Sequence, residues 1–446
     1  MKRGKKKLGL VGLMIMQMVG MVSGQETSAA VALPINSGDT SWILMGAAFV
    51  MLMTPGLAFF YGGLVRRKNI LSVLMQCFMI LCLVTLQWVL FGYSLAFGPD
   101  VKGLIGSLHW AGLSGVGPAP HAVYMPTVPH QAFMIFQAMF AVITPALIIG
   151  AFAERMRFLP FCVFTLLWVT LVYCPVAHWV WADHGLLGTL GGIGALDFAG
   201  GTVVHINAGM AALASALVLG RRQGAPLKIS PPHNLPFAVL GAGLLWFGWF
   251  GFNSASAGSS GQLAASAFVA THVSAAAAGI AWALLDVVFN NRATVLGVIT
   301  GIVAGLVAIT PAAGFVTPMG AIGIGIGAGI VCYIFVSVLK PLFGYDDALD
   351  AFGVHGIGGI WGAIATGIWA TKMVNTAGAD GLLHGNPVQL WIQLKAVLAT
   401  MAYSFVVSFI LLKLVNLVCG LRASEENERI GLDLTEHREV GYTLLD

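Results

Sequence analysis

Long apolar runs recur along almost the whole chain, and they constrain its fold more than any other feature. Between Ser41 and Val418 the sequence repeatedly offers stretches that can cross a bilayer, which takes about 20 apolar residues in a helix. Only 9% of the 446 residues are charged, against about 25% in soluble domains, and the mean hydropathy is +0.88. The sequence therefore predicts an all-α polytopic membrane protein, embedded in a lipid bilayer.

Counting roughly 20 residues per crossing predicts eleven transmembrane helices. We expect them at residues 41–64, 71–97, 131–153, 158–181, 198–220, 235–253, 263–289, 295–310, 318–339, 351–371 and 391–418. Residues 25–418 then form a single transmembrane domain. The charged residues 419–446 form a cytoplasmic C-terminal tail.

The distribution of basic residues predicts the orientation. Connections after odd-numbered spans hold ten Lys and Arg residues, whereas those after even-numbered spans hold only Lys102 and Lys372. By the positive-inside rule, the mature N-terminus lies outside and the C-terminus lies in the cytoplasm.

The start of the chain is typical of a signal peptide. Residues 1–24 combine the basic MKRGKKK, a short apolar run and small residues, and an uncleaved first helix is the alternative. Cleavage removes five of the 22 basic residues and leaves 17 against 18 acidic ones, so nothing suggests nucleic-acid binding. The six cysteines lie in or beside apolar spans, which argues against a disulfide framework.

Two distant segments share one pattern. DFAGGTVVHINAG and DALDAFGVHGIGG place an aspartate, a histidine and a glycine at equal offsets: Asp197, His205 and Gly209, then Asp347, His355 and Gly359. They end two sets of five spans, at about 41–220 and 235–371. Because five is odd, the second set enters the membrane from the opposite side. The pattern predicts a five-plus-five inverted repeat with a transport path at its interface.

Ionisable side chains inside membrane spans are candidates for function, so we expect His205 and His355 to line a path. The alternative is that each is a buried imidazole satisfied by nearby backbone. No Cys or carboxylate stands convincingly beside them as a further ligand, so neither a metal nor another cofactor is expected. Asp197 and Asp347 precede helix starts, where a carboxylate caps backbone N–H groups; capping is the favoured role, and attraction of a cation is compatible with it.

Aromatic residues gather near the predicted outer ends of several spans. The members are Phe136, Phe140, Trp181, Trp249 and Phe252, with the hydroxyl of Ser256 close by in sequence. For each ring alone, a place in the core or against lipid is the alternative. Together the rings can form a cup, because aromatic faces attract a small cation.

Several segments resemble signatures of the Amt/Mep/Rh ammonium transporter family, from about residue 41 to the tail: PGLAFFYGGLVRRKN, GAFAERMRF, ALDFAGGTVVHINAG, PHNLP, GWFGFNSASAG, TPAAGFV and DAFGVHGIGG. The resemblance implies a homotrimer of eleven-helix protomers with the Amt/Rh-type fold. It also implies an outer ammonium site at Trp181, Phe140 and Ser256 above Asp197, a gate at Phe140 and Phe252, and a pore at His205, His355 and Trp249. One departure is that the loop after Trp181 is several residues longer than in bacterial members.

The resemblance and the residues together predict ammonium uptake across a bacterial inner membrane. Ammonium is captured outside and deprotonated, ammonia passes the histidines, and methylammonium is a second substrate. The tail resembles those of transporters that pair with a PII-type signal protein. The alternatives are an ammonium sensor that signals through such a partner, and a Rhesus-type gas channel for ammonia or carbon dioxide. An intramembrane enzyme is disfavoured because HExxH and GxSxG motifs are absent.

Overall fold

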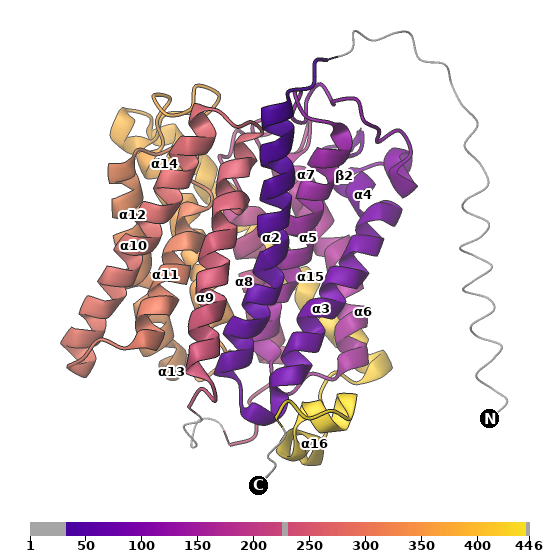
Figure 1. Ribbon diagram of the computed structural model, residues 1–446, viewed down its shortest axis with the longest axis vertical. Helices are drawn as coiled ribbons and strands as arrows, with labels where there is room; N and C mark the ends of the chain where they lie inside the picture. Colours follow the sequence, from indigo (N-terminus) through magenta and orange to yellow (C-terminus); the bar gives the residue numbers. More distant parts are fainter. Residues whose placement is uncertain (1–32, 225–230, 443–446) are drawn as a thin grey trace, which may run out of the picture. The chain divides into compact units, whose positions relative to one another are not determined.

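Apolar helices run side by side through nearly all of the computed structural model, which describes residues 33–224 and 231–442 (Figure 1). Residues 34–446 cluster as one unit. Its α-helices are α2 (Ser37–Leu64), α3 (Ile70–Gln87), α4 (Tyr93–Phe97), α5 (His130–Phe152), α6 (Phe158–Trp168), α7 (Cys174–Trp181), α8 (Asn207–Leu219), α9 (Leu235–Trp249), α10 (Gln262–Asn290), α11 (Val295–Ile309), α12 (Pro318–Tyr333), α13 (Lys340–Phe343), α14 (Ile357–Trp369), α15 (Pro387–Cys419) and α16 (Glu425–Ile430). The predicted signal peptide lies outside the described residues.

Each of the eleven expected spans coincides with a helix, but the count of eleven crossings is not reproduced. Within the described ranges, nine helices are long and apolar enough to span a membrane. The expected span at 295–310 is the shorter helix α11. The one at 351–371 consists of α14 and the short segment before it, Phe352–Gly356. The chain is a multi-pass helical membrane protein.

Widened π-helical turns interrupt the helices at several points. They include η5 (Gly201–Ile206), η6 (Phe250–Ser254) and η9 (Phe352–Gly356), which directly precede or follow α8, α9 and α14. His205, Phe252 and His355 lie on these three segments. Because a π-turn adds a residue to the helical repeat, it redirects the side chains around it, and such turns are frequent at functional sites.

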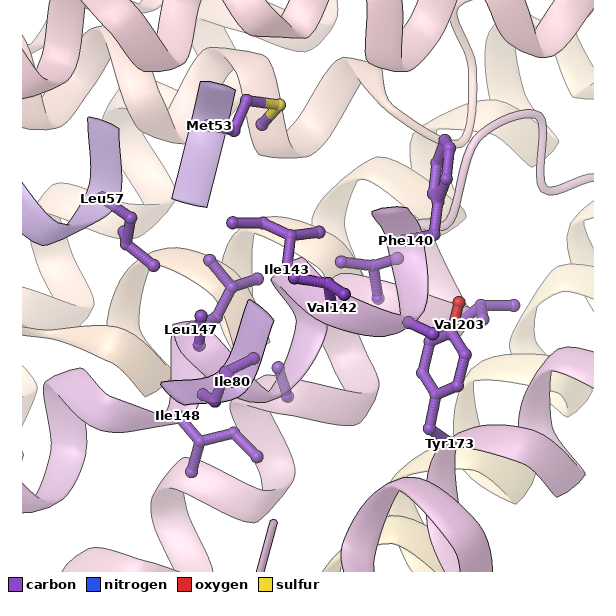
Figure 2. Close-up of a cluster of buried hydrophobic side chains, with 14 of the residues drawn as sticks. Met53, Leu57, Ile80, Phe140, Val142, Ile143, Leu147, Ile148, Tyr173 and Val203 are labelled. Carbon is purple, nitrogen blue, oxygen red and sulfur yellow. The ribbon is translucent and has the colours of Figure 1, made fainter. Parts of the chain in front are cut away.

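Helix α5 is the most deeply buried helix of the unit, with nearly all of its residues enclosed. Figure 2 shows its side chains pointing in several directions, with Ile143 and Leu147 near Met53 and Leu57 of α2. Phe140, on the same helix, lies on the side of Tyr173 and Val203. A helix apolar on all faces is expected in the centre of a membrane bundle, and here it brings Phe140 into the interior.

Small residues bring the two histidine segments into contact. A Cβ added to Gly209 would lie 2.2 Å from the Cα of Gly356, and one on Gly359 would lie 3.0 Å from the Cβ of His205. No larger residue fits at Gly209 without moving backbone, as expected where membrane helices cross closely. The glycines thus set the spacing between His205 and His355.

Short segments close both ends of the bundle. At the end where α2 begins, residues 98–129 carry the two-residue strands β1 (Asp100–Val101) and β2 (Ile105–Gly106), which pair antiparallel, and the 3₁₀ segment η3 (Leu108–Leu113). At the opposite end lie α16 and the π-helical η11 (Asp433–His437) of the tail (Figure 1). We call these the α2 end and the tail end. The tail packs on α3 through Asp433, which accepts a hydrogen bond from the backbone N–H of Ser72.

Candidate functional site

Five aromatic rings form a continuous file through the interior of the bundle. Trp181 and Phe140 meet edge to face with centroids 5.7 Å apart, and Phe140 lies 4.3 Å from Phe252. Phe252 stacks on His205 at 6.0 Å, and His205 stacks on His355 at 5.5 Å. These residues come from α7, α5, η6, η5 and η9, so the file exists only in the tertiary structure.

The file begins at a pocket at the α2 end, which we call the first pocket. It measures about 460 Å³ and is lined by Trp181, Phe140, Phe136 and Ser256, all of which were predicted from sequence. The Ser256 hydroxyl donates to the carbonyl of Phe252 at 2.8 Å, so its oxygen retains accepting capacity toward the pocket. The Trp181 indole N–H donates to the carbonyl of Asp197 at 3.0 Å, which fixes the orientation of the ring beside the pocket.

Sequence reasoning missed other residues of the first pocket. Asp39, Gln137 and Phe198 also line it. Asp39 lies in the first turn of α2, far in sequence from every motif, and only its place at a predicted helix start gave a signal. Gln137 follows Phe136 within α5 and carries no distinguishing pattern.

Asp197 caps the segment that carries His205. Its carboxylate accepts backbone N–H bonds from Gly200, Gly201 and Thr202 at 2.6 to 2.8 Å, and a further bond from the Thr202 hydroxyl. It does not line the first pocket. Its contacts in the structure are those of a capping carboxylate.

Asp347 occupies the corresponding position before His355. Its carboxylate accepts backbone N–H bonds from Ala351 at 3.1 Å and Phe352 at 2.7 Å. Burial, opposed by the charge of Lys340, raises the pKa of Asp347 to about 6. Both aspartates of the repeated pattern therefore have the same local role.

The two histidines are buried and their nitrogens are poorly satisfied. Within the described part of the chain, neither ring nitrogen of His205 and not Nδ1 of His355 has a hydrogen-bond partner. The hydrogen bond that a facing pair of imidazoles allows is therefore not formed. Instead the rings stack with 14° between their planes, and Trp249 stacks on His205 at 5.5 Å.

A second pocket opens at the tail-end side of His355. It measures about 320 Å³ and is lined by His355, Tyr61, Trp282, Asp286 and Asp350, among others. The ring file thus joins two pockets on opposite sides of the histidine pair. Nowhere in the described ranges is a group of three or more His, Cys, Asp or Glu side chains arranged to hold a metal ion.

Comparison with known proteins identifies the family that has this architecture. A model of the Ammonium Transporter Family matches residues 41–442. The chain belongs to the ammonium transporter family. It is 54% identical to an ammonium transporter of Bacillus subtilis over 91% of this chain and 98% of that protein. It is 46% identical to the ammonium transporter Amt1 of Archaeoglobus fulgidus, over 92% of this chain and all of that one.

Solved structures agree with the family assignment. The crystal structure of Candida albicans Mep2 matches with a TM-score of 0.84 at 37% identity, covering 91% of this chain and 92% of that one. A structure described as a sensor Amt protein matches with a TM-score of 0.81 at 30% identity, covering 90% and 98%. The activity of this family member is ammonium transport, and its relatives are named as transporters rather than enzymes.

Proposed function

We propose that the protein takes up ammonium by binding the cation in the first pocket, removing its proton, and conducting ammonia along the ring file past His205 and His355. The observation that carries this proposal is the unbroken file of buried rings between two pockets. The first pocket offers the faces of Trp181 and Phe140 to a cation and the Ser256 oxygen to an N–H group.

Deprotonation supplies the selectivity. The rings of Phe140 and Phe252, 4.3 Å apart, are hydrocarbon and cannot replace the water shell of an ion at this point of the file. A charged solute therefore meets a large desolvation penalty, which neutral ammonia avoids. Potassium resembles ammonium in size and charge but has no neutral form. On the first-pocket side the cation gives its proton to water, and at the second pocket ammonia takes a proton from water and leaves hydroxide.

The histidines supply polar contacts below the gate. A neutral imidazole has one donor and one acceptor nitrogen, which matches ammonia. The nitrogens of His205 without a protein partner support this role, since a buried polar atom without a partner is destabilising unless a solute or water serves it.

The proposal also covers the membrane, the orientation, the oligomeric state and the partner of the protein. Arg66 and Arg222 both contact Glu154, and their chain neighbours Lys68 and Gln223 donate hydrogen bonds to Glu428 of the tail. This gathering of basic residues at the tail end supports a cytoplasmic tail end and an outer first pocket. We place the protein in a bacterial inner membrane as a homotrimer, with methylammonium as a second substrate. A PII-type signal protein is its proposed cytoplasmic partner. Light scattering of the purified protein and co-purification with PII test these two assemblies.

Replacement of the histidines tests the path. In proteoliposomes, His205→Leu and His355→Leu are expected to lower methylammonium uptake at least ten-fold, because each removes the polar contact at one position. His384→Leu, in the connection before α15, is the matched control and is expected to transport like the wild type. Wild-type rates and wild-type exclusion of potassium in both pore variants would contradict the proposal.

The route of the released proton determines whether net charge moves. Currents recorded on a solid-supported membrane during ammonium pulses distinguish two cases. A current indicates that the proton crosses separately from ammonia, and its loss in His205→Leu would show that the imidazoles relay it. The absence of current shows that ammonia crosses alone.

A further inference from the structure

Each pocket at the ends of the ring file contains one carboxylate that no basic side chain neutralises. Among the described residues that line the first pocket, Asp39 is the only acidic one, and the lining holds no Lys or Arg. The second pocket is lined by Asp286 and Asp350, of which Asp350 is paired with Lys340 at 2.5 Å. No salt bridge of Asp39 or Asp286 occurs in the described part of the protein.

Asp39 is held by neutral donors from two other segments. Its Oδ2 accepts from the hydroxyl of Thr127 at 2.6 Å, in the loop before α5. Its Oδ1 accepts from the backbone N–H of Ser260 at 2.9 Å and from the Ser260 hydroxyl at 3.1 Å. These bonds fix the carboxylate beside the pocket and, through Ser260, join α2 to the segment that follows Ser256. They leave its full negative charge uncompensated.

Asp286 has a matching environment at the other pocket. Its Oδ2 accepts from the hydroxyl of Thr294 at 2.6 Å and from the Thr294 backbone N–H at 3.3 Å. Its Oδ1 accepts from the side-chain amide of Asn290 at 3.3 Å. Like Asp39, it is almost completely buried and has only neutral partners.

We propose that Asp39 and Asp286 are a matched pair of cation-collecting residues, one for each direction of transport, an inference that rests on the proposed function. A negative charge in a cleft with low-dielectric walls focuses its field into the opening and raises the local concentration of cations. Asp39 thus increases ammonium occupancy beside Trp181 and Phe140. Asp286 increases the concentration of ammonium that enters from the tail-end side.

The electric field of Asp39 is expected to change the KM for methylammonium only on the side of the first pocket. In right-side-out vesicles at low ionic strength, Asp39→Asn is expected to raise the KM of methylammonium uptake about three- to ten-fold with an unchanged maximal rate. Asp39→Glu keeps the charge and is expected to stay near the wild-type KM. Raising the ionic strength with N-methyl-glucamine chloride is expected to raise the wild-type KM and to leave that of Asp39→Asn nearly constant, because salt screens the field.

Efflux from preloaded vesicles tests the other carboxylate. Asp286→Asn is expected to raise the KM for internal methylammonium by a similar factor and to leave the KM of uptake unchanged, whereas Asp39→Asn does the reverse. Asp380→Asn, whose carboxylate lines neither pocket, is the matched control and is expected to change neither constant.

Thr127→Val and Asn290→Ala separate charge from positioning, because each removes a hydrogen bond and leaves the carboxylate charged. If they raise KM as much as the Asn variants, the carboxylates act only as clamps and the inference is wrong. A wild-type KM that does not depend on ionic strength overturns it without any variant. Failure of the wild type to transport methylammonium would instead overturn the proposed function.

Discussion

The imidazole of His205 lies parallel to that of His355, with ring centroids 5.5 Å apart, and no protein hydrogen bond holds either of its nitrogens among the described residues. Its orientation therefore depends on stacking between His355, Trp249 and Phe252. A ring held by its faces keeps both edges available to a solute, whereas a ring held by a nitrogen gives up one donor or acceptor.

Loss of the support behind Trp249 is expected to loosen His205. The indole N–H of Trp249 donates to the hydroxyl of Thr310 at 2.9 Å. Thr310→Val leaves this buried donor without a partner, at a cost of about 1–3 kcal/mol. We expect methylammonium uptake to fall several-fold and the thermal midpoint to decrease. Thr366→Val, a buried threonine that bonds only within its own helix, is expected to change uptake little. Equal uptake in both variants would show that Trp249 does not set the position of His205.

A side chain at Gly209 is expected to separate the two histidine segments. The added Cβ of Gly209→Ala lies 2.2 Å from the Cα of Gly356, so backbone must move, at a cost of about 3 kcal/mol. Thermal unfolding in detergent and methylammonium uptake both report the change, and both are expected to decrease. Gly243→Ala in α9 meets nothing within 4 Å and is expected to be neutral for stability. A Gly209→Ala protein as stable as Gly243→Ala would contradict the close contact.

An ion-pair network at the tail end is expected to make stability depend on pH. Burial alone would raise the pKa of Asp346, but the hydrogen bonds and charge of Arg222 outweigh it and hold the pKa at about 2. Because this value lies below that of the unfolded chain, the stabilisation is complete above about pH 4 and is lost as the pH falls toward 2. Asp346→Asn is expected to destabilise the protein by about 3 kcal/mol at neutral pH.

The difference in thermal midpoint between wild type and Asp346→Asn should thus stay constant from pH 8 to pH 5 and shrink below pH 4. Glu439→Gln, in an exposed part of the tail, should show no difference at any pH. A gap between wild type and Asp346→Asn that widens toward low pH would have the wrong sign for this mechanism.

Docking of the tail is expected to depend on Glu428. This buried carboxylate accepts from Arg422 Nε at 2.6 Å and Nη2 at 3.2 Å. Glu428→Ala removes this pair, and trypsin should then cleave after Arg429 and Arg438 about ten-fold faster, which corresponds to about 1.4 kcal/mol. Glu425→Ala, an exposed neighbour in α16, serves as control and should be cleaved like the wild type. Equal cleavage of the two variants would show that other contacts hold the tail.

The positions of the helices followed from the sequence, but their ends did not. The span expected from residue 198 begins at Gly201, because Asp197 holds the preceding turn through its carboxylate. The count of eleven spans is not confirmed exactly, because α11 has only 15 residues and α14 is preceded by the π-helical segment Phe352–Gly356. Apolar runs indicate burial in lipid or in protein without distinguishing the two, so the lengths of these helices come from the structure.

Sequence motifs predicted some residues of the candidate site and missed others. His205 and His355 stood out because an ionisable group in an apolar span is unusual, and the structure places their rings together. Asp39 did not stand out because it precedes the first expected span, at a helix start where carboxylates are common. Asp286 lies near the end of the expected span 263–289 and belongs to no repeated motif. Only the folded chain brings each of them to the wall of a pocket.

The sequence by itself determined that this chain is a multi-pass helical membrane protein, which two segments repeat each other, and which side chains are anomalous in lipid. These properties depend on the composition of the chain and on the spacing of its residues. The free energy of transferring an apolar side chain from water to lipid favours burial whatever the fold. The tertiary structure alone decided that five rings from five separate segments form one file, and that the tail packs on α3. Such contacts depend on how the helices cross, which glycines and π-turns determine. The pattern of residues along the sequence does not show how these features change the direction of a helix.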